Sequence, residues 1–508
     1  MTQLRDKQVL VLGLGETGLS LARWLDAQGA RLRVADSRAE PSGIATLRSE
    51  LPQAEVHCGA FDDSLLQGVD LVAISPGVPL ADPFVQRAVA RGIPVVGDIE
   101  LFAQHLSTQS SALSPRVIAI TGSNGKTTVT AMVEHMCRAA GKDVVAAGNI
   151  SPAVLDAVLQ RGARQPEVWV LELSSFQLET TFSLNADAAV VLNVSEDHLN
   201  RYAGMNDYAA AKARIFNGSG VQSRPGAAEP SGAGATASHL LPQTAGFASN
   251  VSEVQVLNRD DARSMGMALP GRNQVTFGLT ATPILSMSGW KGVDSAGGIE
   301  GDFGIERHAG SIWLMQGGER LIKTSELQVT GLHNAANALA ALALCRAIDL
   351  PMHKLIDALR KFKGLPHRVE RVAEIGGVIY YDDSKGTNVG ATIAALQGLG
   401  RAAVLIAGGE GKGQDFAPLK PVVARHARAV VLIGRDAPLI EAALGGCGVA
   451  VLRAKDMDAA VRQAAHLAQS GDAVLLSPAC ASFDMFRNYA HRAEVFVAAI
   501  RSLGGEGG

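Results

Sequence analysis

A glycine-rich loop carrying a lysine and two threonines is the stretch of this chain best suited to chemistry. The β-branched run Val117-Ile-Ala-Ile120 predicts a buried strand, and Thr121-Gly-Ser-Asn-Gly-Lys-Thr-Thr128 predicts a turn from that strand into a helix. Glycines in such a turn let backbone N–H groups converge on phosphate oxygens, while Lys126 adds positive charge and the Thr127 hydroxyl suits Mg²⁺. The pattern indicates a nucleoside triphosphate with its metal.

This loop departs from the common phosphate-binding pattern at one place. A glycine is usual five residues before Gly125, and this chain has Ile120 there. An ordinary glycine-rich turn between a strand and a helix is therefore the alternative interpretation.

The next two predicted strands carry an acid and a histidine, the acid within the first strand and the histidine shortly after the second. Glu172 lies inside the apolar strand Trp169–Leu173, where an unpaired carboxylate would cost several kcal/mol. His198 ends the segment after the strand Ala188–Asn193. Beside a phosphate loop these side chains are candidates for holding Mg²⁺ or orienting phosphates, although a capping or surface role would equally explain His198.

A second glycine loop near the N-terminus predicts another phosphate-bearing ligand. Val9-Leu-Val-Leu12 reads as a strand, Gly13-Leu-Gly-Glu-Thr-Gly18 as its turn into a helix, and Asp36 ends the following strand. This is the layout of a dinucleotide-binding β-α-β unit, which leaves a nicotinamide or flavin cofactor and some other phosphate ligand as alternatives. Ser75 and Gly77 would lie at the same sheet edge, where Ser75 could also be plain turn chemistry.

Composition narrows the protein class. A chain of 508 residues is too long for a single hydrophobic core, and 47% of its residues are hydrophobic. It has 55 glycines, and many of its apolar runs end in glycine, which favours several α/β layers. A formal charge of −3 shows no basic excess, so nucleic acid is not expected as a partner. Five scattered cysteines predict a reducing cytoplasm, and the polar N-terminus predicts no membrane span. We expect a monomer.

Linker composition and restarting patterns predict three α/β domains. A Rossmann-like domain spans 1–109, a central domain with a phosphate loop and a mostly parallel sheet spans 110–364, and a second Rossmann-like domain spans 365–508. Glycine-rich insertions at 218–238 and 288–301 interrupt the central domain and suggest no chemistry.

Taken together, the motifs resemble the Mur ligase family over nearly the whole chain and in family order. The phosphate loop matches the short family form, which explains Ile120. The other matching segments are Gly148–Ile150, Glu172–Glu179, Asn193–His198, Ala211–Ile215, Gly331–Asn337, His367–Arg368, Asp383–Asn388 and Ser477–Asp484. Within that family, the first glycine loop with Asp36-Ser-Arg38 and the segments at 383–388 and 482–483 resemble those of members that add D-glutamate.

The resemblance implies an ATP-dependent ligase joining D-glutamate to UDP-N-acetylmuramoyl-L-alanine through an acyl phosphate, with two Mg²⁺ ions. It implies that the first glycine loop holds the uridine diphosphate end and no redox cofactor. The implied UDP-substrate residues are Gly15, Thr17, Asp36, Ser37, Arg38, Ser75 and Gly77. The implied ATP residues are Gly122, Ser123, Asn124, Gly125, Lys126, Thr127, Thr128, Asn334, Arg368 and Asp383. A helix start capped by asparagine is the alternative for Asn334.

By the same resemblance, catalysis involves Lys126, Asn149, Glu172, His198 and Lys212. The implied metal ligands are Thr127, Glu172, His198 and Lys212, and the implied D-glutamate site comprises Lys385, Thr387, Lys412, Ser482 and Phe483. Lys212 is expected to act as a carbamate formed with CO₂, because an ammonium group would repel Mg²⁺. From the sequence alone, a solvated helix lysine is the alternative.

Three other functions compete with this interpretation. An NAD-dependent dehydrogenase would explain the first glycine loop but not the second. A nucleotide-dependent switch or scaffold would not need the candidate acceptor residues. A Mur ligase family member that adds a different amino acid is the nearest alternative.

Overall fold

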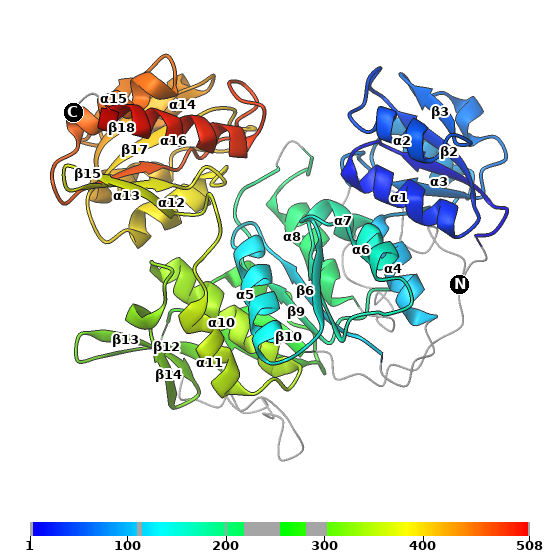
Figure 1. The fold of residues 1–508 in the computed structure, drawn as a ribbon, viewed down its shortest axis with the longest axis horizontal. Helices are drawn as coiled ribbons and strands as arrows, with labels where there is room; N and C mark the ends of the chain where they lie inside the picture. The colour runs from blue at the N-terminus through cyan, green and yellow to red at the C-terminus, as the bar shows by residue number, and fades with distance from the viewer. Residues whose placement is uncertain (1–3, 109–113, 199–200, 218–253, 281–301, 506–508) are drawn as a thin grey trace.

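Three parallel-rich sheets follow one another along the chain in the computed structural model (Figure 1). The structure describes residues 4–108, 114–198, 201–217, 254–280 and 302–505. The two insertions predicted at 218–238 and 288–301 lie outside these residues. The α/β class and the arrangement of three successive domains are confirmed.

The N-terminal domain has a five-stranded parallel sheet in the order β3-β2-β1-β4-β5. Its strands are β1 (Gln8–Leu12), β2 (Arg31–Asp36), β3 (Glu55–Cys58), β4 (Leu71–Ile74) and β5 (Val95–Val96). The helices are α1 (Glu16–Ala27), α2 (Ile44–Glu50) and α3 (Pro83–Ala90), with a 3-10 turn at Asp63–Leu66. The strand order reverses beside β1, and ligands bind such sheets at that point, outside the carboxyl ends of the strands.

Helix α4 (Asp98–Ser107) joins the N-terminal domain to the central one. Phe102 of α4 meets Trp169 edge-on with ring centroids 5.1 Å apart, and one apolar core continues from β1 through α4 to the central sheet. Gly97, just before α4, lets the backbone approach Thr180, since a Cβ atom at Gly97 would lie 2.3 Å from the Thr180 hydroxyl oxygen. The junction between the two domains is closely packed at this point.

The central domain has a nine-stranded sheet in the order β14-β13-β12-β11-β10-β9-β6-β8-β7. The parallel strands are β6 (Arg116–Thr121), β7 (Val144–Gly148), β8 (Val168–Glu172), β9 (Ala188–Val191), β10 (Val254–Asn258) and β11 (Asn273–Phe277). Strand β12 (Phe303–His308) pairs parallel to β11 and antiparallel to β13 (Ser311–Gln316), which pairs antiparallel to β14 (Glu319–Lys323). The expectation of a mostly parallel sheet is confirmed.

Helices cover both faces of this central sheet. Helices α5 (Lys126–Ala139), α10 (Leu332–Ala347) and α11 (Met352–Lys361) bury an apolar core on one face. The other central helices are α6 (Val154–Arg161), α7 (Ser175–Glu179), α8 (Met205–Ala213) and α9 (Ala262–Met265), with 3-10 turns at Arg214–Phe216 and Thr324–Glu326. The α7 and α8 helices follow strand ends of β8 and β9, so they bring their side chains to the carboxyl edge of the sheet.

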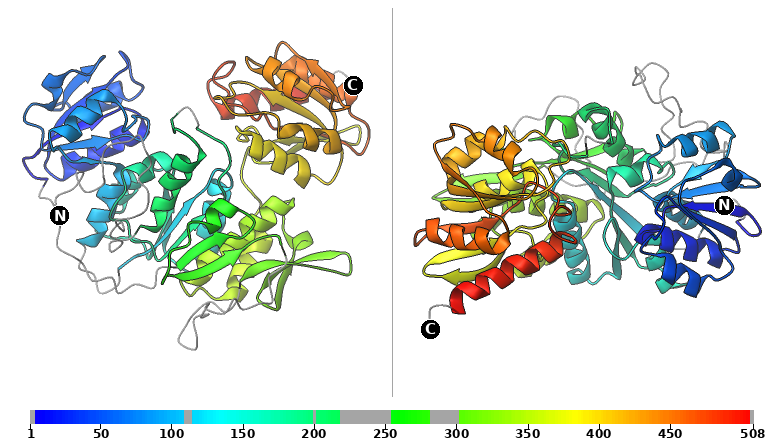
Figure 2. Two further views of the ribbon diagram at one scale, coloured as in Figure 1. Left: turned by 180° about the vertical axis from the view of Figure 1, so that it is seen from behind. Right: turned by 90° about the horizontal axis from the view of Figure 1, so that it is seen from above.

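The third domain has a six-stranded sheet in the order β15-β16-β20-β17-β18-β19. Its strands are β15 (Glu370–Ile375), β16 (Val378–Asp382), β17 (Ala403–Gly408), β18 (Ala427–Ile433), β19 (Ala450–Arg453) and β20 (Ala473–Leu476), of which only β15 runs antiparallel to its neighbour. The helices are α12 (Val389–Gly398), α13 (Leu419–His426), α14 (Ala437–Ala443), α15 (Met457–Leu467) and α16 (Tyr489–Gly505). Figure 2 shows helices on both sides of this sheet, and apolar cores fill both faces, so the sheet is doubly wound.

Among the described residues, none of the helices combines the length and the apolar character that a membrane crossing requires.

Candidate functional site

A cavity of about 430 Å³ lies at the carboxyl edge of the N-terminal sheet and reaches the central domain. It brings together every residue that the family resemblance assigned to the UDP-substrate: Gly15, Thr17, Asp36, Ser37, Arg38, Ser75 and Gly77. The central domain contributes Gly148, Asn149 and Gln177 to the same lining. One elongated ligand could therefore touch both domains.

Asp36 organises the N-terminal end of this cavity. Its buried carboxylate accepts hydrogen bonds from the Leu14 backbone N–H at 2.7 Å and from the Arg38 guanidinium at 2.7 and 2.9 Å. These bonds, with Arg38 the largest cause, lower the pKa of Asp36 to about 2. Asp36 therefore holds the first glycine loop against Arg38, whose cationic side chain is more than half exposed and lies beside the cavity.

The central phosphate loop follows β6 as predicted. Gly125 has a left-handed backbone, with φ of 86°, and a Cβ atom there would lie 2.6 Å from the Asn337 amide oxygen, so glycine is needed for both reasons. Lys126 donates from Nζ to the carbonyl oxygens of Gly122 at 2.8 Å and Ser123 at 3.1 Å. The lysine is thereby folded over the loop into which a phosphate would fit.

Glu172 and Asn149 connect the cavity with the phosphate loop. Glu172 is the last residue of β8, whereas the sequence predicted that it would lie inside the strand. Its Oε1 accepts a hydrogen bond from Asn149 Nδ2 at 2.9 Å, while its buried Oε2 has no hydrogen-bond partner among the described residues. A buried carboxylate oxygen without a partner is costly unless a cation or donor binds there.

His198 and Asp197 lie at the end of the loop after β9. Burial lowers the pKa of His198 to about 4, so its imidazole is neutral at pH 7 and keeps a nitrogen lone pair for a metal. Burial alone would raise the pKa of Asp197, but Lys412, His198 and Lys126 together lower it. Asp197 is an anion facing several cationic or metal-binding groups.

Lys212 is buried in α8 beside the phosphate loop. Its Nζ donates to the Gly122 carbonyl at 3.0 Å and lies 4.6 Å from the Tyr208 ring centroid. Burial, followed by repulsion from Lys126, lowers the pKa of Lys212 well below the ordinary value. The alternative of a solvated surface lysine is therefore wrong.

The third domain contacts the phosphate loop and the segment after β9 through three polar side chains. Arg368 donates to the Thr127 hydroxyl at 2.9 Å. Lys412 forms an ion pair with Asp197 at 2.9 Å. Asn388 donates to the Asn124 amide oxygen at 3.0 Å. Groups from both domains thus meet where the triphosphate is expected.

The remaining predicted residues differ in burial and in their partners. Burial raises the pKa of Asp383 to about 7, although a hydrogen bond from Ser477 and the charge of Arg368 oppose the shift. Lys385 Nζ lies 5.1 Å from the Tyr489 ring centroid. Ser482 is buried, whereas Phe483 is 72% exposed. Asn334, on α10, accepts a hydrogen bond from Asn337 at 3.2 Å, so the two share a helix face.

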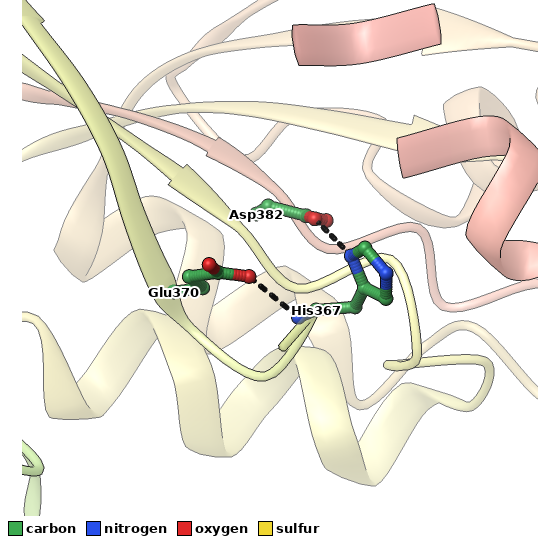
Figure 3. Close-up of side chains that lie close together, drawn as sticks. All are labelled: His367, Glu370 and Asp382. Carbon is green, nitrogen blue, oxygen red and sulfur yellow. Dashed lines mark hydrogen bonds and ion pairs between the residues drawn. The ribbon is translucent and has the colours of Figure 1, made fainter. Parts of the chain in front are cut away.

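His367, Glu370 and Asp382 form a polar cluster where the chain enters the third domain (Figure 3). His367 Nδ1 lies 2.6 Å from Asp382 Oδ2, and the His367 backbone N–H donates to Glu370 at 2.9 Å. Asp382 Oδ1 also accepts the Ser384 backbone N–H at 2.9 Å. These bonds join the three residues directly and fix the turn that carries Asp383.

Three family models match successive parts of the chain. They describe a Mur ligase MurD-like N-terminal domain at residues 7–97, a Mur ligase middle domain at 120–224 and a Mur ligase glutamate ligase domain at 367–480. The chain belongs to the Mur ligase family. A relative from Nitrosospira multiformis, named UDP-N-acetylmuramoylalanine–D-glutamate ligase, is 55% identical over 98% of this chain and 96% of its own. One of the same name from Thiobacillus denitrificans is 55% identical over 99% and 97%.

Solved structures of other Mur ligases share the fold. UDP-N-acetylmuramate-alanine ligase from Thermotoga maritima is 19% identical, with a TM-score of 0.55 and coverage of 97% of this chain and 99% of its own. The MurF ligase of the same organism, in complex with ADP, is 16% identical, with a TM-score of 0.53 and coverage of 99% of both chains.

The donor set of this Mur ligase chain fits a hard divalent cation. The unpartnered Glu172 Oε2, the Thr127 hydroxyl and the neutral His198 lie at strand or loop ends around one phosphate loop. Oxygen donors beside phosphates are the usual surroundings of Mg²⁺. Glu172 supplies the negative charge such an ion needs.

Four residues at this site were not singled out from the sequence: Asp197, Asn388, Gln177 and Tyr489. The Ser174-x-x-Gln177 pattern is a helix-capping signature and could have fixed the orientation of Gln177. Asp197 and Asn388 have local partners in the His198 and Ala391 backbone N–H groups, but each also bonds to the other domain, and no local pattern marks those contacts.

Proposed function

We propose that this chain is an ATP-dependent ligase that joins D-glutamate to UDP-N-acetylmuramoyl-L-alanine in peptidoglycan precursor synthesis. Relatives carrying the D-glutamate ligase name are 51–55% identical to it over nearly their whole length. The structural observation that supports the proposal most is the cavity, which runs from Asp36 to Asn149, and Asn149 is bonded to Glu172 beside the phosphate loop. A UDP-sugar in that cavity would have its far end beside the nucleotide.

In the first step, the terminal carboxylate of the UDP-substrate attacks the γ-phosphorus of ATP, and ADP leaves. The mutual repulsion of these anions must be neutralised, and Lys126 with the N-terminus of α5 supplies positive charge for the phosphates. Bound Mg²⁺ would further neutralise the phosphate oxygens, with Thr127, Glu172 and His198 as its holders. The product is an acyl phosphate and ADP.

In the second step, the neutral amine of D-glutamate attacks the carbonyl carbon of the acyl phosphate, and the tetrahedral intermediate expels inorganic phosphate as the amine proton departs. D-Glutamate carries two carboxylates, and cationic and hydroxyl donors suit them. We assign the D-glutamate site to Lys385, Thr387, Lys412, Ser482 and Phe483. Lys412 and Lys385 supply the charge, and Lys412 is paired with Asp197 in this structure. Because Phe483 is largely exposed, its role would require the third domain to move.

Nucleotide contacts are assigned to Asn334, Arg368 and Asp383 together with the phosphate loop. We place the domain boundaries at 1–109, 110–364 and 365–508, and we propose a monomer that works in the cytoplasm with two Mg²⁺ ions.

We further propose that Lys212 is a carbamate in the active enzyme. A neutral amine adds to CO₂ with loss of one proton, and the lowered pKa of Lys212 keeps its amine neutral at lower pH than that of an ordinary lysine. The carbamate is an anion and would offer oxygen to Mg²⁺. A ¹³C-bicarbonate NMR signal that is present in the wild type and absent from Lys212→Met would support this. An identical spectrum for both would contradict it.

ADP release with UDP-N-acetylmuramoyl-L-alanine across a panel of amino acids tests the main function. We expect turnover with D-glutamate and none with L-lysine, L-alanine or diaminopimelate. Equal turnover with another amino acid would instead favour a family member of different specificity. NADH fluorescence quenching on the same protein serves as a control for the dehydrogenase interpretation.

A further inference from the structure

A buried carboxylate on α4, Asp98, bonds to a residue that lines the cavity. Asp98 is 1% exposed, and its Oδ2 accepts a hydrogen bond from Gln177 Nε2 at 3.0 Å. Its Oδ1 has no hydrogen-bond partner among the described residues. Asp98 belongs to the N-terminal side of the junction and Gln177 to α7 of the central domain, so the bond links the two domains beneath the cavity.

The orientation of the Gln177 amide is fixed at both ends. Its oxygen accepts from the Ser174 backbone N–H at 3.1 Å and from the Ser174 hydroxyl at 3.2 Å. The Gln177 backbone N–H donates to Ser174 Oγ at 3.2 Å, which completes a capping box with the first of these bonds. The side-chain amide nitrogen therefore points toward Asp98. A side-chain amide carries two N–H donors, and Asp98 takes one of them. The second has no acceptor among the described residues, and Gln177 lines the cavity.

Close packing makes this arrangement rigid. The Gly97 backbone before Asp98 approaches Thr180 at the end of α7, as described above. A second acid of α4, Glu100, accepts from the backbone N–H groups of Phe182 at 2.7 Å and Ser183 at 2.9 Å. Two acids thus tie α4 to the segment around α7, but only Asp98 bonds to a residue that lines the cavity.

We propose that Asp98 is a positioning residue that aims the free N–H of Gln177 at an oxygen acceptor of the bound substrate. The acceptor is a carbonyl or hydroxyl oxygen in the part of the ligand that crosses from the N-terminal domain toward Asn149. The inference rests on the proposed function, because it takes the cavity to be the site of the UDP-substrate.

Substituting both partners separates positioning from simple structural support. Asp98→Val removes the acceptor, and we expect the KM for UDP-N-acetylmuramoyl-L-alanine to rise about tenfold, the value of one hydrogen bond, with kcat and the KM for ATP within twofold of wild type. Asp98→Asn keeps an acceptor oxygen and should stay near wild type. Glu100→Gln is the matched control, which should lower the melting temperature without changing that KM.

The double variant Asp98→Asn with Gln177→Glu is decisive and conserves net charge. The amide introduced at position 98 would then donate to the carboxylate introduced at position 177, which can still accept from Ser174. The melting temperature should therefore recover relative to Gln177→Glu alone. However, the introduced carboxylate has no N–H for the cavity, so the KM should stay high. Recovery of both quantities, or an unchanged KM in Asp98→Val, would overturn the proposal. If Asp98→Val does not fold, the double variant still decides.

Calorimetry on the wild type keeps the two claims apart. If the UDP-substrate does not bind the wild-type protein, the proposed function fails, and this inference fails with it. If it binds normally and the variants show no difference in its KM, only the role of Asp98 is overturned.

Discussion

Replacing Asp36 by asparagine should weaken both the fold and the substrate site of the N-terminal domain. The carboxylate accepts a hydrogen bond from the Leu14 N–H at 2.7 Å, and each of its oxygens accepts one from the Arg38 guanidinium. These contacts lower its pKa from 3.8 to about 2, a difference that corresponds to roughly 2.4 kcal/mol. We expect Asp36→Asn to lose about 2 kcal/mol of the free energy of unfolding at pH 7.

The stabilising contribution of Asp36 should decrease as the pH falls. The folded pKa of Asp36 lies below the unfolded value, so its contribution is fully present above the unfolded pKa near 4 and is lost as the pH falls toward about 2. From these two pKa values, the contribution of Asp36 to the free energy of unfolding is roughly 1.3 kcal/mol at pH 3. The stability difference between wild type and Asp36→Asn should therefore be constant from pH 5 to 8 and about half as large at pH 3.

Hydrogen exchange on residues 8–18 of the full-length protein, measured across a urea series, reports this local stability. Asp70→Asn is the matched control, because Asp70 belongs to the same domain and bonds to Gln8 and Lys7, but is about 40% exposed and lies outside the cavity. It should cost less and leave the KM for the UDP-substrate unchanged, whereas Asp36→Asn should raise that KM. A stability difference that does not shrink between pH 5 and pH 3 would refute the electrostatic reasoning.

Three further substitutions follow from the contacts described above. Lys126→Ala should abolish ADP release while leaving the Kd of the UDP-substrate unchanged in calorimetry, because Lys126 is not among the residues that line the cavity. Lys212→Met should reduce ADP release by more than about a hundredfold without lowering the melting temperature. Losing a group that only orients a metal ligand costs at most about a hundredfold, and Lys212 is proposed to be a ligand itself. Gly97→Val should reduce the free energy of unfolding by about 1–3 kcal/mol in urea titrations, because its Cβ would lie 2.3 Å from the Thr180 hydroxyl oxygen.

Local patterns predicted the two phosphate-type loops because each carries its own parts within a few residues. The strand before Gly122, the left-handed Gly125 and the helix after Lys126 are consecutive in the chain. Asp36 was recognised by its spacing from the first loop. In these cases the backbone itself places the side chains, so sequence order determines geometry.

Contacts between domains could not be read in this way. Arg368 reaches Thr127 across 241 residues of chain, and Lys412 reaches Asp197 across 215. Their partners depend on how two separately folded domains are docked, and no periodicity encodes that. The family resemblance pointed to Arg368 and Lys412 but not to Asp197. Burial, which lowers the pKa of Lys212, likewise depends on the packing of α8 against the phosphate loop.

The side chains that dock the third domain are the ones proposed to hold ligands. Arg368 bonds to the hydroxyl assigned to Mg²⁺, and Lys412 is neutralised by Asp197 where a carboxylate of D-glutamate is expected to bind. If the ligands bind as proposed, their anionic groups would replace these protein partners of Arg368 and Lys412. The docking contacts pair these charges within the protein, and their loss on binding would couple occupancy of the site to the position of the third domain.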